Sequence, residues 1–167
     1  EVKRGLAKKL ASEGGLAGVA GKHFENVDGS GDAFNGSHGI MSSITGEYNA
    51  LGKLVVDVQQ ERPDFDDPDA MKVAMESRKR WSAFLDEATG YNAKQRGDKA
   101  KEFAKKASKA KSGISQARHF MGMATNLSDE VKAQAEEYIS TIEALLEAGD
   151  NTKAESTAKK LSTLLES

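Results

Sequence analysis

The sequence predicts an all-α fold, a helical bundle of five to six helices with a long Ala-rich antiparallel coiled-coil-like hairpin and a glycine-rich N-terminal arm. Three observations support this prediction. Apolar residues recur at steps of three and four along much of the chain, which is the period of a helix. Aromatic residues make up only 6% of the 167 residues, and there are two prolines, a composition that favours helix over strand. No stretch shows the alternation typical of a half-buried strand.

Residues 1–36 form the predicted N-terminal arm and loop. Helical spacing of apolar residues predicts short helices over residues 2–13 and 15–26, followed by a loop over residues 27–39. Glycine costs about 1 kcal/mol at each helical site, so we expect this arm to be mobile or to be ordered by a partner. Its lysines and leucines resemble those of cationic membrane peptides. Its glycine content nevertheless favours docking on a neighbouring subunit over binding to a membrane.

Residues 37–167 form the predicted helical bundle domain. A first helix is expected over about residues 37–61, where apolar residues follow helical steps: Ile40, Ile44, Tyr48, Leu51, Val55 and Val58. A second helix is expected to begin at Pro68 with Asp67 as its cap, because proline suits the first helical position and aspartate accepts from free backbone N–H groups. Gly90 is the expected end of this helix.

The long Ala-rich helix, over about residues 92–125, is the strongest pattern in the sequence. Its apolar residues follow a heptad, and the predicted interface consists of Ala93, Ala100, Phe103, Ala107, Ala110, Ile114, Ala117 and Met121. Small seam residues let two helices approach closely. The methionines at 71, 75, 121 and 123 are interpreted as core filler. Ser128 is the expected cap of the next helix, Gly149 its end, and Asp150 or Thr152 the cap of the last.

Charge is strongly segregated between the two helices that follow Asn92. Residues 94–111 carry eight basic and two acidic side chains, whereas residues 129–150 carry seven acidic and one basic. These helices are predicted to pair across the Ala seam, either within one chain or between two subunits. The alternative is a polyanion-binding or nucleic-acid-binding module that uses the basic helix 94–111 through Lys101, Lys105, Lys106 and Lys109. The overall net charge of −2 provides no general attraction for nucleic acid.

A short segment rich in aspartate and glycine is the only candidate metal site. Its possible oxygen ligands are Asn26, Asp28, Ser30 and Asp32, and the segment resembles the first half of an EF-hand calcium loop. The twelfth position, where that motif has a bidentate glutamate, is Ser37. The resemblance implies calcium as a possible cofactor and a calcium-responsive module over residues 26–37. The alternative interpretation is an ordinary surface loop, which has the same composition.

The sequence as a whole predicts a non-enzymatic helical interaction or structural-assembly protein. Such a protein would self-associate or bind another protein, for example as a subunit of a capsid (virion), a filament or a surface assembly. We find no catalytic or cofactor-binding motif and no indication of a small-molecule substrate. Cysteine is absent, which excludes disulfides and thiolate chemistry. No apolar run is long enough to span a bilayer and no signal peptide is visible, which disfavours a membrane partner and leaves the compartment open.

Overall fold

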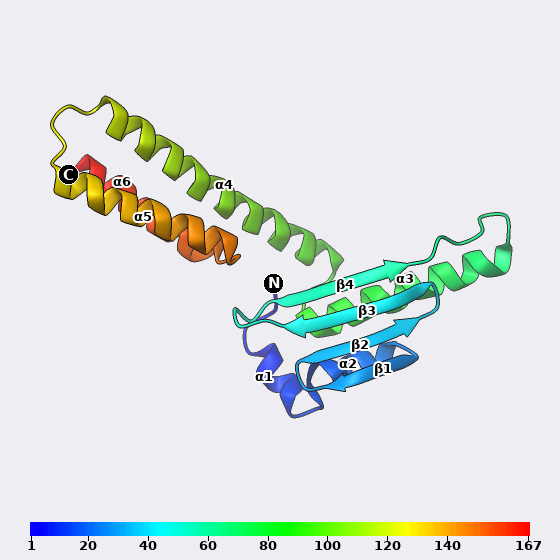
Figure 1. Ribbon diagram of the computed structural model, residues 1–167. Coiled ribbons are helices and arrows are strands. Elements are labelled where there is room, and N and C mark those ends of the chain that lie inside the picture. Colours follow the sequence, from blue (N-terminus) through cyan, green and yellow to red (C-terminus); the bar gives the residue numbers. More distant parts are fainter. The chain divides into compact units, whose positions relative to one another are not determined.

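The structure, a computed structural model, describes residues 1–167 and divides into two compact units, residues 1–97 and 98–167. The first unit contains a four-stranded antiparallel sheet with helices, and the second is made of helices alone (Figure 1). The prediction of an all-α helical bundle is therefore wrong, because the chain is a mixed α/β protein.

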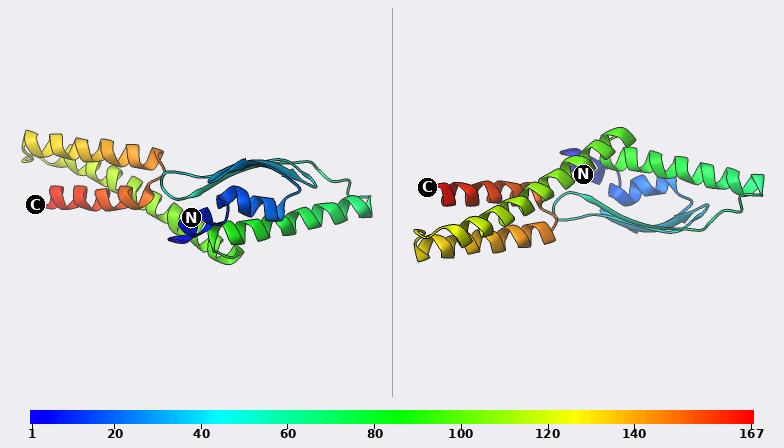
Figure 2. Two further views of the ribbon diagram at one scale, coloured as in Figure 1. Left: turned by 90° about the horizontal axis from the view of Figure 1, so that it is seen from below. Right: turned by 90° about the horizontal axis from the view of Figure 1, so that it is seen from above.

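In the first unit, a sheet and a layer of helices face each other. The elements in chain order are α1 (Leu6–Ala11), α2 (Gly15–His23), β1 (Asn26–Ser30), β2 (Ala33–His38), β3 (Met41–Tyr48), β4 (Leu54–Gln60) and α3 (Pro68–Thr89). Neighbouring strands pair in the order β1-β2-β3-β4, so the sheet is a simple meander. Figure 2 shows the helices of this unit on one face of the sheet and the other face bare.

The predicted loop over residues 27–39 is wrong, since these residues form β1, β2 and the turns beside them. Two-residue turns connect β1 to β2 and β2 to β3, and each begins with a glycine at positive φ, Gly31 at 65° and Gly39 at 52°. Glycine adopts this conformation without a steric penalty, and tight hairpin turns require it. The polar composition that indicated a loop reflects instead a strand pair with little apolar surface.

The predicted helix over residues 37–61 is also wrong, because β3 and β4 occupy this stretch. Residues of β3 alternate between the two faces of the sheet. Ile44 and Gly46 are buried against the helices, whereas Thr45 and Glu47 point to the bare face. Apart from Val55, which is paired with Glu47 and faces the bare side, the apolar residues of β3 and β4 face the helices, with a turn between the strands. Their spacing in the sequence matches a helical period only by coincidence, and β-branched residues in β4 favour the strand.

The N-terminal segment is not a separate arm. Helix α2 lies in the core of the first unit, where Leu16, Val19 and Ala20 are fully or nearly fully buried. Its glycines allow close backbone contact: the Ala17 N–H donates to the Gly31 carbonyl at 3.0 Å, beside the β1–β2 turn. The cost of glycine in a helix is thus offset by packing that a larger residue would prevent.

Aromatic rings fill the space between the sheet and α3. Phe84 from α3 packs against Phe24 and Phe34, with ring centroids at 4.9 and 5.4 Å, and Trp81 lies 5.6 Å from Phe84. Phe34 fits because Gly46 on the neighbouring strand has no side chain; a Cβ there would lie 2.5 Å from the Phe34 ring. These rings share one core with aliphatic side chains of α1, α2 and β3, such as Leu10, Leu16 and Ile44.

The second unit consists of three helices. Helix α4 (Ala93–Met123) begins at the end of the first unit and continues through the second, followed by α5 (Asp129–Glu147) and α6 (Asn151–Glu166). Ala110, Ile114 and Ala117 of α4 share one core with residues of both α5 and α6. Gly113 approaches α6 closely, since a Cβ there would lie 3.0 Å from Ala158. This three-helix packing replaces the predicted coiled-coil-like hairpin of two helices.

The predicted helix boundaries after residue 61 agree with the structure. Asp67 caps α3 by accepting from the Asp69 N–H, Pro68 is its first residue, and Gly90 ends it at a φ of 73°. Ser128 and Asp150 cap α5 and α6 in the same manner. Local cap chemistry determines these ends, which explains why the sequence shows them. No helix of the chain combines the length and apolar character that crossing a membrane requires.

Candidate interaction surfaces

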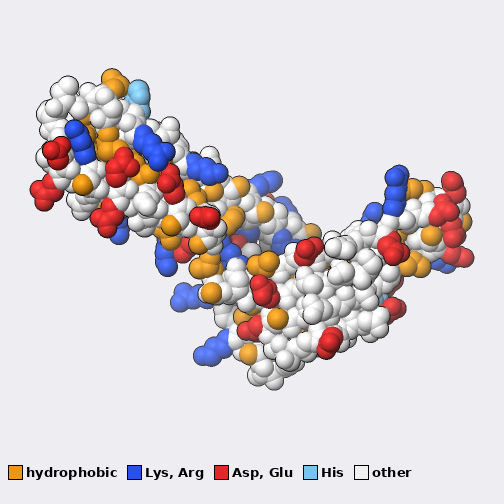
Figure 3. All heavy atoms as spheres, in the orientation of Figure 1, with side chains coloured by type: hydrophobic (Ala, Val, Ile, Leu, Met, Phe, Trp, Pro, Cys, Tyr) orange, Lys and Arg blue, Asp and Glu red, His pale blue; other side chains and the backbone are white.

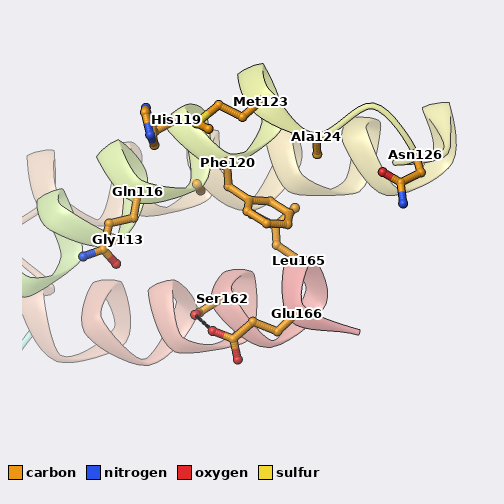
Figure 4. A pocket seen from close by; sticks show the side chains of 11 residues that line it. Gly113, Gln116, His119, Phe120, Met123, Ala124, Asn126, Ser162, Leu165 and Glu166 are labelled. Carbon is orange, nitrogen blue, oxygen red and sulfur yellow. Dashed lines mark hydrogen bonds between the residues drawn. The ribbon is translucent and has the colours of Figure 1, made fainter.

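An apolar groove of about 530 Å³ lies between the C-terminal halves of α4 and α6. Phe120 projects into it from α4 and Leu165 from α6, while the polar pair Ser162 and Glu166 forms part of its α6 side (Figure 4). The Ser162 hydroxyl donates to the Glu166 carboxylate at 2.9 Å. Phe120 is 44% exposed and Met123, on the α4 side, is 70% exposed. These side chains form a solvent-exposed apolar surface rather than a closed core.

The helix surface beside the groove is almost free of charge. Charged residues make up 30% of the chain, yet residues 112–127 contain one of them, Arg118, with His119 next to it. Arg118 is already paired with Glu143 of α5 at 3.0 Å. Orange side chains gather at this end of α4 in Figure 3. Loss of charge together with exposed large apolar side chains is the composition found at the centres of protein interfaces.

The predicted Ala-rich interface lies mainly within the chain's own second unit. Its members Ala110, Ile114 and Ala117 are buried against α5 and α6, and Met121 packs at the edge of the same cluster. The Phe103 carbonyl accepts from the Asn151 side chain at 3.1 Å. Ala107 is half-buried, and only Ala93 and Ala100 are fully exposed. Most of this seam is therefore covered by helices of the same chain and does not present itself to a partner.

The four lysines proposed to bind polyanions fall into two pairs. Lys106 contacts Glu102 at 3.3 Å, and Lys109 contacts Glu155 of α6 at 3.2 Å. The hydrogen bond from Lys109, together with nearby lysine charges, lowers the pKa of the Glu155 carboxyl. Lys101 and Lys105 are exposed on the outward face of α4. Part of the basic surface is thus neutralised within the unit, and polyanion binding stays a prediction from the sequence.

The four proposed calcium ligands lie along β1 and in the turn after it. Asn26, Asp28 and Ser30 are alternate residues of one extended strand, and Asp32 belongs to the turn. Alternate residues of a strand are about 6.6 Å apart, so β1 spreads these oxygens along a line instead of gathering them around one point. No three metal-ligating side chains converge anywhere in the chain. Calcium binding also stays a prediction from the sequence.

An ion-paired cluster joins α2 to α3 in the first unit. The Glu87 carboxylate contacts the Lys22 ammonium at 2.9 Å and His23 Nε2 at 2.6 Å. Burial alone would raise the pKa of Glu87, but hydrogen bonds from Lys22 and His23 outweigh it and lower this pKa. Tyr48 donates its hydroxyl to the Ala88 carbonyl at 2.6 Å nearby. These contacts tie α2 to α3 through Glu87 and tie β3 to α3 through Tyr48.

The sheet has two edge strands, β1 and β4, and β4 is the longer of the two. No strand pairs with the outer side of Leu54–Gln60, and Val55 and Val56 on it are 47% and 36% exposed. On the bare face beside this edge lies a shallow hollow of about 480 Å³, whose lining includes Glu47, Val55 and Asp57. Figure 3 shows this face as mostly uncharged polar surface with scattered acidic side chains. This surface could not be recognised from the sequence, because the spacing of its apolar residues predicts a helix there.

The fold thus defines a mixed α/β protein, with a sheet unit whose longer edge strand is β4 and a helical unit bearing an apolar groove. Residues 1–102 match the family described as Domain of unknown function (DUF5611), and the chain belongs to this family. No curated protein and no solved structure matches the chain. Nothing in the fold or the comparisons supports a coiled coil or a virion component, so these two expectations are withdrawn. The β4 edge lies within the residues that match the family, and the groove of the second unit lies outside them.

Proposed function

We propose that the protein is a non-enzymatic subunit that associates with a second copy of itself through the groove between α4 and α6. The observation that carries this proposal is the uncharged stretch of α4 with Phe120 and Met123 exposed beside the groove. Exposed apolar side chains gathered on one uncharged stretch, in a chain otherwise rich in charge, are best explained by a partner that covers them. Burying these side chains would remove apolar area from water at about 25 cal/mol per Å².

A second copy is the partner that the charge distribution favours. In a two-fold symmetric interface each residue lies near its own counterpart, so charged residues close to the axis repel one another. The stretch over residues 112–127 avoids this, since its one charged residue is already paired within the unit. His119 on the α4 side and Glu166 on the α6 side could pair between copies. Adding a fourth helix between α4 and α6 would complete a four-helix arrangement.

The test is the mass of the full chain in solution, measured by light scattering over a hundredfold range of concentration. We expect the mass to rise above the 17.9 kDa of one chain and the association to survive high salt, because it is apolar. One helix face is small, so the dissociation constant is expected to be about micromolar or weaker. A chain that stays monomeric throughout would overturn the proposal. Loss of association at high salt would instead point to the charged helices.

A matched pair of variants tests the location of the interface. Phe120→Ser with Met123→Ser should leave the chain monomeric. Phe65→Ser with Met75→Ser removes the same residue types at similar exposure, 59% and 56%, from the first unit and should leave the association unchanged. Equal effects of the two double variants would show that the groove is not the interface.

A further inference from the structure

The β4 edge of the sheet carries backbone groups that no strand pairs with. The hydrogen bonds on the other side of β4 identify these groups. The Tyr48 N–H donates to Asp32 on the β2 side, and the Asn49 N–H donates to Lys53 on the β4 side. Because successive residues of a strand direct their backbone groups to opposite sides, residues 43, 45 and 47 bond to residues 59, 57 and 55 of β4. The N–H and C=O groups of Leu54, Val56 and Val58 therefore point away from the sheet.

This edge carries few of the devices by which proteins usually protect an edge strand, and the one irregularity in its pairing lies at the end of the ladder, between Met41 and Ser43 of β3. β4 contains no lysine, no proline and no glycine, and no other backbone group bonds to its outward side. Native edges are commonly blocked by such residues, by bulges or by a covering segment. At the opposite edge β1 is only five residues long and contains Gly29, and the turn that follows it is bonded to α2 through Gly31 and Ala17. An unprotected edge of seven residues is suited to accept another strand.

The side chains beside β4 indicate the chemistry of that strand. On the helix side, Leu54, Val56 and Val58 would neighbour every second residue of an added strand, which calls for apolar side chains. On the bare side, Asp57 would lie directly beside the added strand, and Glu47 on β3 would lie one strand further from it. The four strands contain three carboxylates and no lysine or arginine, and the nearest base, Lys53, lies in the preceding turn. Opposite charges across strands are favourable and like charges are not.

We propose that β4 binds an extended segment of another protein, in which apolar residues alternate with lysine or arginine. The segment would add a fifth strand to the sheet. Its apolar side chains would cover Val56 and extend the core of the first unit. Its basic side chains would pair with Asp57 on the bare face, giving the site its specificity. This site is separate from the groove of the second unit, so either proposal can fail without the other.

The experiment uses two synthetic peptides and NMR spectra of the full isotope-labelled chain. One peptide is Thr-Val-Lys-Val-Lys-Val-Thr, and the other has glutamate in place of lysine. We expect the lysine peptide to shift the amide signals of residues 54–60 and not those of β1, with an affinity about threefold or more above that of the glutamate peptide. The variant Asp57→Lys should reverse this preference. Equal binding of both peptides, shifts at β1, or no shift at millimolar peptide would overturn the proposal.

A proline at an outward-facing position tests the backbone part of the site. Val56→Pro removes one outward N–H while leaving the β3–β4 hydrogen bonds intact, so peptide binding should be lost although the sheet is retained. If this variant does not fold, a lysine peptide methylated on its valine nitrogens tests the same bonds from the other side, and undiminished binding contradicts the proposal. Self-association that survives the groove variants but disappears in Val56→Pro would show that the occupant is β4 of a second copy, which contains no base, and would overturn the proposal of a basic segment.

Discussion

The cores of the two units differ in their largest side chains, because three phenylalanines are buried in the first and no aromatic residue is buried in the second. The first places a few large aromatic rings between a sheet and α3, with Gly46 leaving room for Phe34. The second packs small and aliphatic side chains between three helices, and Gly113 faces Ala158 at its closest point. Removal of a large buried ring leaves a larger cavity than removal of a small side chain, so the first core should depend more strongly on its single largest members. The comparison predicts where substitutions should matter most.

The largest expected effect is the loss of the central ring of the first core. Phe84 is fully buried and contacts Phe24, Phe34 and Trp81, so Phe84→Ala should lower the free energy of unfolding by about 3–5 kcal/mol. Trp81 is the only tryptophan of the chain, and its fluorescence during urea unfolding reports on this unit alone.

The matched substitution in the second unit is Leu161→Ala, at a fully buried position of α6. The two cores share no residue, so this variant should shift the helical circular dichroism signal while leaving the Trp81 transition in place. If both variants move the Trp81 transition equally, the two units unfold as one and the comparison fails.

The glycines at the two closest approaches give the next largest difference. Gly46→Ala would place a Cβ 2.5 Å from the buried Phe34 ring, and such overpacking should cost about 1–3 kcal/mol. Gly113→Ala meets Ala158 at 3.0 Å, but the gain of about 0.5–1 kcal/mol from replacing glycine in a helix offsets this contact. We expect Gly113→Ala to be nearly neutral in thermal unfolding. A more harmful Gly113→Ala than Gly46→Ala would contradict this account of the two cores.

These glycines also show why the sequence revealed one unit better than the other. The helices after residue 67 could be predicted because Asp67, Gly90, Ser128 and Asp150 mark their ends through local hydrogen bonds. The sheet could not be recognised from apolar spacing. One inward-facing residue of β3 is Gly46, and the Phe34 ring of β2 occupies the space that an apolar side chain would fill there. The main local signal was the pair of glycine-led turns, such as Gly31 followed by Asp32, which is typical of a tight hairpin.

The candidate surfaces were hidden for a different reason. Met123 follows the helical spacing of a core residue, and the prediction of core filler is wrong there, as it is for Met75. Whether such a residue is buried depends on where the neighbouring helix ends, which is a tertiary property. Met121 is half-buried beside the core as predicted. For Met123, the low charge of residues 112–127 was the available signal, and it indicates an interface only once the exposure of Phe120 is known.

Helix caps should contribute alike in both units, because they depend on local geometry and not on the core. Asp67→Ala in the first unit and Ser128→Ala in the second each remove a side chain that accepts from a free backbone N–H. Each should cost about 1 kcal/mol in urea unfolding, followed by Trp81 fluorescence and by circular dichroism respectively. The conservative variants Asp67→Asn and Ser128→Thr should restore most of the loss. A much larger cost in one unit would show that its cap also supports tertiary packing.

The smallest expected difference is a sensitivity to alkaline pH that belongs to the first unit. Burial, with added repulsion from Asp32 and Glu87, raises the pKa of Tyr48 from 10.0 to about 12. The folded chain therefore keeps the phenol proton at pH values where the unfolded chain has lost it. The stability that this provides is fully present below pH 10 and is lost as the pH rises towards about 12.

The variant Tyr48→Phe isolates this effect from the titration of the lysines in both units. It removes the hydrogen bond to the Ala88 carbonyl, so the variant should be less stable than the parent chain at neutral pH. The difference between the two should then shrink as the pH passes from 10 to about 12, because only the parent chain has a phenol to titrate. Urea unfolding followed by Trp81 fluorescence across this range measures it. A difference that stays constant would show that Tyr48 ionises as easily in the folded chain as in the unfolded chain, and that burial does not raise its pKa.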